Sequence, residues 1–184
     1  MQTINEDIKS GQYKKVYLLY GEESFLKQSY KKKLKEAVAG DDTMNYNYFE
    51  GKGLDVNELI SLSDTMPFFS DKRLIIIEDS GFFKTSSEAL ADYLPMIPDT
   101  TCIVFVEDAV DKRNRLFKKV KELGHAAEMK RQDSAQLARW AGTILAQNGR
   151  KITGSTMNLF LERTGDDMEN IRMELEKLIS YTMG

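Results

Sequence analysis

Lys15 begins the segment KVYLLYGEESFLKQSYKKKLKEAV, which runs to Val38 and combines three kinds of local pattern. The residues from Lys15 to Tyr20 are mostly apolar and Gly21 closes the run, as in a short β-strand followed by a turn. From Ser24 to Val38 apolar residues recur at helical spacing, which predicts an α-helix. Strand, turn and helix in this order make up the repeating unit of parallel α/β folds.

The same unit recurs along the chain to about residue 130. Further strands are predicted at four places, which are Asn45–Glu50, Arg73–Ile77, Thr101–Val106 and Ala126–Met129. Helical patterns lie between them, one capped by Asp55 and another ended by Gly124. Because each buried strand needs helices on both of its faces, residues 1–132 are expected to form a three-layer α/β domain with a mostly parallel five-stranded sheet.

Residues 133–184 show only helical patterns, separated at Gly149 and Gly165. The apolar positions expected to face inward are Leu137, Trp140, Ile144 and Leu145, then Leu159 and Phe160, then Met168, Ile171, Leu175 and Leu178. Three helices of this size bury too little to make a large core of their own. We therefore expect a small three-helix lid domain that packs on the α/β domain.

Composition excludes several classes of protein. The 184 residues include one cysteine, Cys102, and one histidine, His125, so this chain can form neither an internal disulfide nor a zinc site or Cys–His pair of its own. No apolar run is long enough for a membrane span, and the start MQTINEDIKSGQ lacks a secretion signal, so we expect a cytoplasmic protein. A net charge of -3 gives no overall reason to expect nucleic-acid binding.

The turn after the first predicted strand lies where a phosphate-binding loop, G-x-x-x-x-G-K-[ST], would be found. Gly21 and Lys27 match that motif, but Leu26 replaces its second glycine and Gln28 replaces the hydroxyl that binds Mg²⁺. The turn is either a degenerate phosphate loop or an ordinary connection, and neither reading predicts ATP binding. Lys27 recurs with Lys31 and Lys35 on one helix face, which is the usual pattern of a solvated surface.

Two acidic pairs, Glu78-Asp79 and Glu107-Asp108, follow the third and fourth predicted strands. Ligands of α/β sheets bind at this edge, so the acids are the best argument for an enzyme. They would act with Lys27 in a nucleotide-dependent phosphotransferase or ATPase, which is the alternative function. We favour solvated turn acids, because no nucleophile or other catalytic partner accompanies them.

The connection before the third predicted strand contains Met66, Pro67, Phe68 and Phe69 in succession. Connections run over the surface and Pro67 stiffens this one, so the two phenylalanine rings could bind a partner's pocket in a preset shape. The rings could equally fill the edge of their own core. Spacing alone leaves both interpretations open.

Taken together, these segments resemble the delta subunits of the bacterial DNA polymerase III clamp loader. The resemblance rests on the order of Tyr17–Glu23 with Phe25-Leu26, Met66–Phe69, Lys72–Ile77, Asp111-Lys112-Arg113, Gly165–Ile171 and Glu174–Leu178. It implies an AAA+ or RecA-like three-layer sandwich and a helical lid. The collar domain that follows the lid in this family would be missing, since the chain would end before it.

The resemblance also implies a function without catalysis. Delta subunits bind and open the ring-shaped sliding clamp, the beta subunit, through a hydrophobic wedge, and they do not hydrolyse ATP although they belong to a DNA-directed DNA polymerase assembly. The wedge maps onto Met66, Pro67, Phe68 and Phe69, where the family commonly has leucine in place of Phe68. No catalytic residue, metal or cofactor is expected. Other loader subunits would bind through the collar, and the assembled loader would contact DNA.

Basic residues near the fourth predicted strand are the candidates for that DNA contact. They are Lys112, Arg113 and Arg115. Such contacts would involve phosphates and carry little sequence information.

Overall fold

The computed structural model describes residues 1–85 and 87–182. The chain forms two compact units, Met1–Lys130 and Arg131–Gly184. They divide within the segment that joins the last strand to the next helix, which is also where we expected a boundary after residue 132.

The first unit is built on a parallel sheet. Its described residues form five strands, β1 (Val16–Tyr20), β2 (Tyr46–Glu50), β3 (Arg73–Glu78), β4 (Thr101–Glu107) and β5 (His125–Glu128), in the spatial order β2-β3-β4-β1-β5. Each neighbouring pair is parallel. Every predicted strand coincides with an observed one to within about two residues at each end, so the α/β prediction is confirmed.

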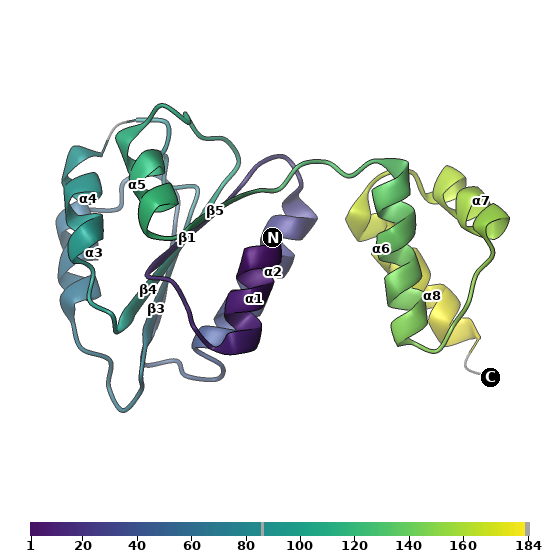
Figure 1. The fold of residues 1–184 in the computed structure, drawn as a ribbon, viewed down its shortest axis with the longest axis horizontal. Coiled ribbons are helices and arrows are strands. Elements are labelled where there is room, and N and C mark those ends of the chain that lie inside the picture. Colours follow the sequence, from purple (N-terminus) through teal and green to yellow (C-terminus); the bar gives the residue numbers. More distant parts are fainter. Residues whose placement is uncertain (86, 183–184) are drawn as a thin grey trace. The chain divides into compact units, whose positions relative to one another are not determined.

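Helices cover both faces of this sheet (Figure 1). One face carries α1 (Gln2–Ser10) and α2 (Ser24–Val38), and the other carries α3 (Val56–Asp64), α4 (Glu88–Tyr93) with the short 3₁₀ helix η1 (Leu94–Met96), and α5 (Arg115–Leu123). Helix α1 was not predicted from the sequence. Its apolar pattern is weak, because most of its residues are polar. Ile4 is fully buried in the structure and Ile8 is partly buried.

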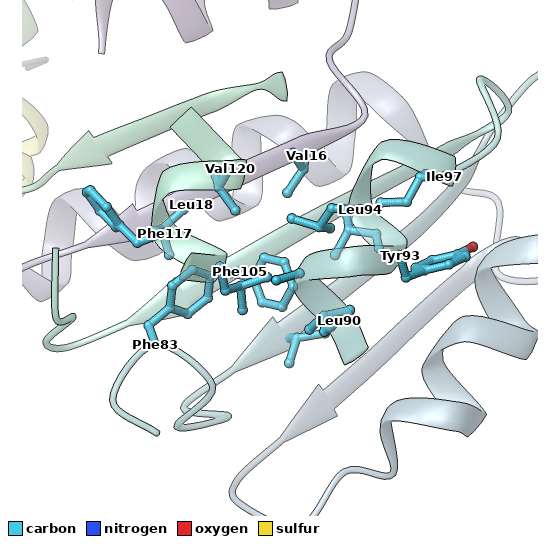
Figure 2. Close-up of a cluster of buried hydrophobic side chains, with 14 of the residues drawn as sticks. Val16, Leu18, Phe83, Leu90, Tyr93, Leu94, Ile97, Phe105, Phe117 and Val120 are labelled. Carbon is cyan, nitrogen blue, oxygen red and sulfur yellow. The ribbon is translucent and has the colours of Figure 1, made fainter. Parts of the chain in front are cut away.

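Successive residues of each central strand face opposite helix layers. Leu18 of β1 packs on the side of α3, α4 and α5, whereas Leu19 packs on the side of α1 and α2. Figure 2 shows the buried cluster on the side of α3, α4 and α5. In this cluster the rings of Phe83 and Phe105 meet edge to face, with their centroids 5.1 Å apart. Cys102 lies fully buried in β4 and is a core residue, as predicted.

The second unit is helical. Its described residues form α6 (Ser134–Gln147), α7 (Gly154–Thr164) and α8 (Met168–Tyr181). Side chains of Asp133, Thr153 and Asp167 cap the three helices by accepting backbone N–H bonds.

The inward face of the last two helices differs from the prediction. Leu159 and Leu178 were expected to face inward, but both are about half exposed, and Met157 and Ile179 are buried in the unit instead. The apolar stripe of a helix drifts around its axis at 3.6 residues per turn, so neighbouring apolar residues compete for the inward position and packing decides between them. Among the helices of the described residues, none is long and apolar enough to cross a membrane.

Candidate functional site

The connection between α3 and β3, residues 65–72, presents large apolar side chains to solvent. Phe69 is 95% exposed, Met66 75% and Phe68 56%, whereas Pro67 is partly covered. Exposure of the two rings removes the interpretation that they fill the edge of their own core. We call residues Met66–Phe69 the wedge. It lies at the amino end of β3, opposite the edge where ligands of α/β sheets usually bind.

The two rings of the wedge pack against each other rather than against the core. Phe68 and Phe69 meet edge to face, with centroids 4.3 Å apart and planes at 75°. Phe69 has a φ of 51°, in the left-handed region that costs a non-glycine residue roughly 1–2 kcal/mol. A strained backbone under an exposed aromatic ring is a feature associated with functional sites.

The amide side chain of Asn45 holds the main chain of Phe68. Asn45 Oδ1 accepts a hydrogen bond from Phe68 N at 2.7 Å, and Asn45 Nδ2 donates to Phe68 O at 2.8 Å. Asp42 in turn accepts hydrogen bonds from the Asn45 side chain at 2.7 Å and backbone at 3.1 Å. These hydrogen bonds, from the Asn45 side chain first, lower the pKa of Asp42.

The guanidinium of Arg73 holds the other half of the turn. Its Nε donates to Thr65 O at 3.1 Å and its Nη2 to Met66 O at 3.4 Å, while Nη1 donates to the side chain of Asn47 at 3.1 Å. Arg73 is buried, and so is Asn45. Neither residue was predicted from the sequence to support the wedge. In the sequence each is a polar residue at the start of a predicted strand, and this pattern does not identify its hydrogen-bonding partners.

The turn between β1 and α2 and the start of α2 contain the residues predicted as a degenerate phosphate loop. Gly21 has a φ of 123°, and a Cβ on it would lie 2.5 Å from Met129 O. Close approach of the chain near β5 therefore accounts for this glycine without any phosphate. Leu26 packs against the core beneath α2, and Gln28 Nε2 donates to Glu78 at 2.6 Å.

Lys27 does not lie on a solvated surface, so that prediction was wrong. The side chain is buried, and its ammonium donates a hydrogen bond to the carboxylate of Asp108 at the end of β4. This hydrogen bond lowers the pKa of Asp108. A lysine that would bind phosphate in an active loop is here neutralised by an acid of the same chain.

The prediction of solvated turn acids was also wrong for Glu78 and Glu107. Glu78 accepts hydrogen bonds from Lys31 at 2.7 Å and Tyr48 at 3.0 Å in addition to that from Gln28. Glu107 is buried and accepts a hydrogen bond from Ser80, and burial raises the pKa of its carboxyl. At this end of the sheet, Lys27, Gln28, Glu78 and Glu107 are therefore each hydrogen-bonded to another side chain.

The basic residues considered for DNA contact are each paired with acids. Lys112 Nζ lies 3.1 Å from Glu128, Arg113 Nη2 lies 3.0 Å from Asp111, and Arg115 Nη1 lies 2.6 Å from Glu88 with Asp92 as a second partner. Their charges are therefore largely balanced locally. Within the described residues, no group of three or more His, Cys, Asp or Glu side chains could hold a metal ion.

A family model described as DNA polymerase III, delta subunit, matches residues 17–130, which include the wedge and the Lys27–Asp108 pair. The chain belongs to the DNA polymerase III delta subunit family. The resemblance seen in the sequence is thus confirmed. Delta is a subunit of a polymerase assembly.

Two curated members of this family are similar over most of the chain. DNA polymerase III subunit delta of Bacillus subtilis is 21% identical over 189 residues, covering 96% of this chain and 54% of the relative. The probable subunit of Aquifex aeolicus is 23% identical over 179 residues, covering 91% of this chain and 50% of the relative. The chain spans about half the length of these relatives.

Solved structures show the same fold. The Bacillus subtilis DNA clamp loader delta protein superposes with a TM-score of 0.80 at 20% identity, over 99% of this chain and 57% of that one. A gamma subunit-related protein of Thermotoga maritima gives a TM-score of 0.52 at 14% identity, over 96% and 57%. The replication initiator DnaA gives 0.50 at 16% identity, over 97% and 59%. The AAA+ type of fold expected from the resemblance is confirmed.

Proposed function

We propose that this chain acts as the delta subunit of a clamp loader, which binds the ring-shaped sliding clamp through the wedge and favours its open form. The observation that carries the proposal is the exposure of Phe68 and Phe69 on a turn whose main chain is held from inside the domain. Membership of the delta family and the likeness to a clamp loader delta protein support it.

The wedge has enough apolar surface to anchor a protein partner. Burying a phenylalanine side chain contributes on the order of 1.5–3 kcal/mol. Phe68 and Phe69 together would therefore supply a large share of the roughly 8 kcal/mol that corresponds to micromolar affinity, before the costs of association. Aromatic residues that enter a partner's pocket are frequent hot spots of protein interfaces.

Opening of the clamp would follow from selective binding. The two rings would occupy the apolar pocket of the clamp, while α3, which leads directly into the wedge, would press on the interface that closes the ring. A binder can shift the equilibrium between closed and open rings only by the difference between its affinities for the two forms. No covalent chemistry is needed for this step.

The proposal includes the absence of ATP hydrolysis by this chain. The pairing of Lys27 with Asp108 and of Gln28 with Glu78 supports it, because these side chains stand where an active loop would contact phosphates and Mg²⁺. Energy for loading would then come from other loader subunits, which are expected to assemble with delta through the collar domain.

We also propose that any contact with DNA occurs only in the assembled loader, in the cytoplasm. Lys112, Arg113 and Arg115 are weak candidates for it, because each is already paired with a carboxylate. Phosphate contacts made by such residues would weaken strongly with added salt.

Binding of the purified sliding clamp from the same genome tests the proposal. The wild-type chain is compared with the Phe68→Ala plus Phe69→Ala double variant on an immobilised clamp. Loss of both rings is expected to weaken binding by about a hundredfold or more. Tyr181→Ala, which removes an exposed aromatic ring in the second unit, serves as the matched control and should bind like the wild type.

Thermal unfolding of the same proteins separates binding from folding. Both rings of the wedge are exposed, so the free energy of unfolding of the double variant should change by no more than about 0.5 kcal/mol. Equal clamp affinity of the wild type and the double variant would remove the wedge from the mechanism. A large fall in the stability of the double variant would show instead that the rings belong to the core.

A further inference from the structure

We propose that Asn45 is a positioning residue for clamp binding, assisted by Arg73, and that it sets affinity by holding the wedge in its bound shape before the clamp arrives. This inference rests on the proposed function of the wedge. Asn45 itself is 1% exposed, so its side chain acts through Phe68 rather than by touching the partner.

Asn45 binds both hydrogen-bonding groups of one wedge residue. Its Oδ1 accepts from Phe68 N at 2.7 Å and its Nδ2 donates to Phe68 O at 2.8 Å. The amide thus takes the place of the main chain of a neighbouring strand, which would otherwise bond to the N–H and C=O groups of Phe68. It fixes the position of Phe68 and satisfies two polar groups that would otherwise need water.

Asp42 determines which way the Asn45 amide points. The Nδ2 group of Asn45 donates to Asp42 Oδ2 at 2.7 Å, and Asp42 Oδ1 accepts from the backbone N–H of Asn45 at 3.1 Å. A carboxylate accepts hydrogen bonds and cannot donate them, so it selects the NH₂ end of the amide. The oxygen end is thereby directed to the N–H of Phe68.

Arg73 holds the chain on the other side of Pro67. Its buried guanidinium donates to Thr65 O at 3.1 Å and Met66 O at 3.4 Å, the two carbonyls that precede the proline. The planar fork of an arginine is suited to such fixed multiple contacts. Main-chain groups are therefore held before and after Pro67, while the side chains of the wedge stay free to meet a partner.

A wedge held in this way loses less conformational freedom on binding. Ordering a flexible side chain at an interface has an entropic cost, and a loose main chain adds to this cost. The left-handed φ of 51° at Phe69 would relax if Phe68 were released, which would move the second ring as well. Removal of Asn45 should therefore weaken clamp binding although no contact with the clamp is lost.

Titration of the purified clamp with Asn45→Ala and Asn45→Asp tests the inference. Asn45→Asp keeps the size of the side chain and an acceptor for Phe68 N, but it places an oxygen against Phe68 O and a second carboxylate beside Asp42. Both variants are expected to bind about tenfold more weakly than the wild type. Arg73→Lys, which keeps the charge and loses the fork, should weaken binding in the same direction and provides a second test if Asn45 variants fold poorly.

Two measurements separate positioning from general destabilisation. Hydrogen exchange at the Phe68 amide should become faster in Asn45→Ala, because its acceptor is gone. Ser80→Ala is the control, since it removes a buried hydrogen bond to Glu107 at the opposite end of β3 and should leave clamp affinity unchanged. Unaltered clamp affinity in Asn45→Ala, or an equal loss in Ser80→Ala, would overturn the inference.

A double-mutant cycle identifies the route of the effect. In the Phe68→Ala plus Phe69→Ala background, Asn45→Ala should weaken binding by clearly less than tenfold, because both rings that it positions are absent. A full tenfold loss in that background would show that Asn45 acts independently of the two rings and would overturn the inference. Should the double variant bind like the wild type, the proposed function fails first, whereas loss with the double variant but not with Asn45→Ala rejects positioning alone.

Discussion

The two ends of the parallel sheet differ in where their functional-looking side chains find contacts. At the carboxyl end, Lys27 is bonded to Asp108 and Glu107 to Ser80, so charged and polar side chains that resemble a nucleotide site have partners within the chain. At the amino end, the main chain of the wedge is bonded from inside while Phe68 and Phe69 project into solvent. β3 runs between the two ends.

This difference shows which end is available to a partner. A buried charge that already has a partner gains little from a new ligand, because the internal pair must first be broken. An exposed aromatic ring gains from any contact that removes it from water. The phosphate-loop and acidic patterns of the sequence lie at the carboxyl end, whereas the exposed rings of the wedge lie at the amino end.

The largest expected effect on stability concerns the carboxyl end of the sheet. Asp108→Ala should lower the free energy of unfolding by about 2 kcal/mol, because it leaves the buried ammonium of Lys27 without its partner. Lys27→Met should cost clearly less, since the carboxylate left behind is largely exposed and water can solvate it. Urea unfolding measures both, and equal losses would contradict this account of the pair. Clamp affinity should be unchanged in either variant.

A smaller effect concerns strain at the amino end. Phe69→Gly should make the protein more stable than Phe69→Ala by roughly 1 kcal/mol, because glycine adopts the observed φ of 51° without steric cost. Both variants lack the ring and should bind the clamp more weakly than the wild type. Thermal unfolding provides the measurement, and identical midpoints would show that the turn is not strained.

The pH dependence of the Lys27–Asp108 pair should be smaller still. The hydrogen bond from Lys27 lowers the pKa of Asp108 in the folded state, so the unfolded chain binds protons more readily at acidic pH. Stabilisation by the pair is therefore complete above the ordinary aspartate pKa of about 4 and is lost as the pH falls through the folded value. For this largely exposed carboxylate we expect up to about 1 kcal/mol, and the dependence should vanish in Lys27→Met.

The smallest expected effect is the heat of nucleotide binding. Calorimetry with MgATP should show no measurable binding to the wild type, because Lys27 and Gln28 near the start of α2 are bonded to Asp108 and Glu78. Micromolar binding that is lost on Lys27→Ala would reverse the comparison between the two ends and restore the phosphotransferase alternative.

Much of the site could be located from the sequence, but its supporting contacts could not. Periodicity placed Lys27 on α2, yet its partner Asp108 comes from β4 and nothing local connects the two. Asn45 likewise precedes β2 and bonds to a residue of the turn before β3. Contacts of this kind depend on which strands become neighbours, here β2 with β3 and β1 with β4.

Local pattern was sufficient to predict the strands, the α-helices of the described residues other than α1, and the α/β class, because spacing and turn residues act over a few positions. The exposure of Phe68 and Phe69 was decided by the assembled fold. Whether an apolar ring is covered depends on the elements that pack around it, and these are brought together only when the sheet forms.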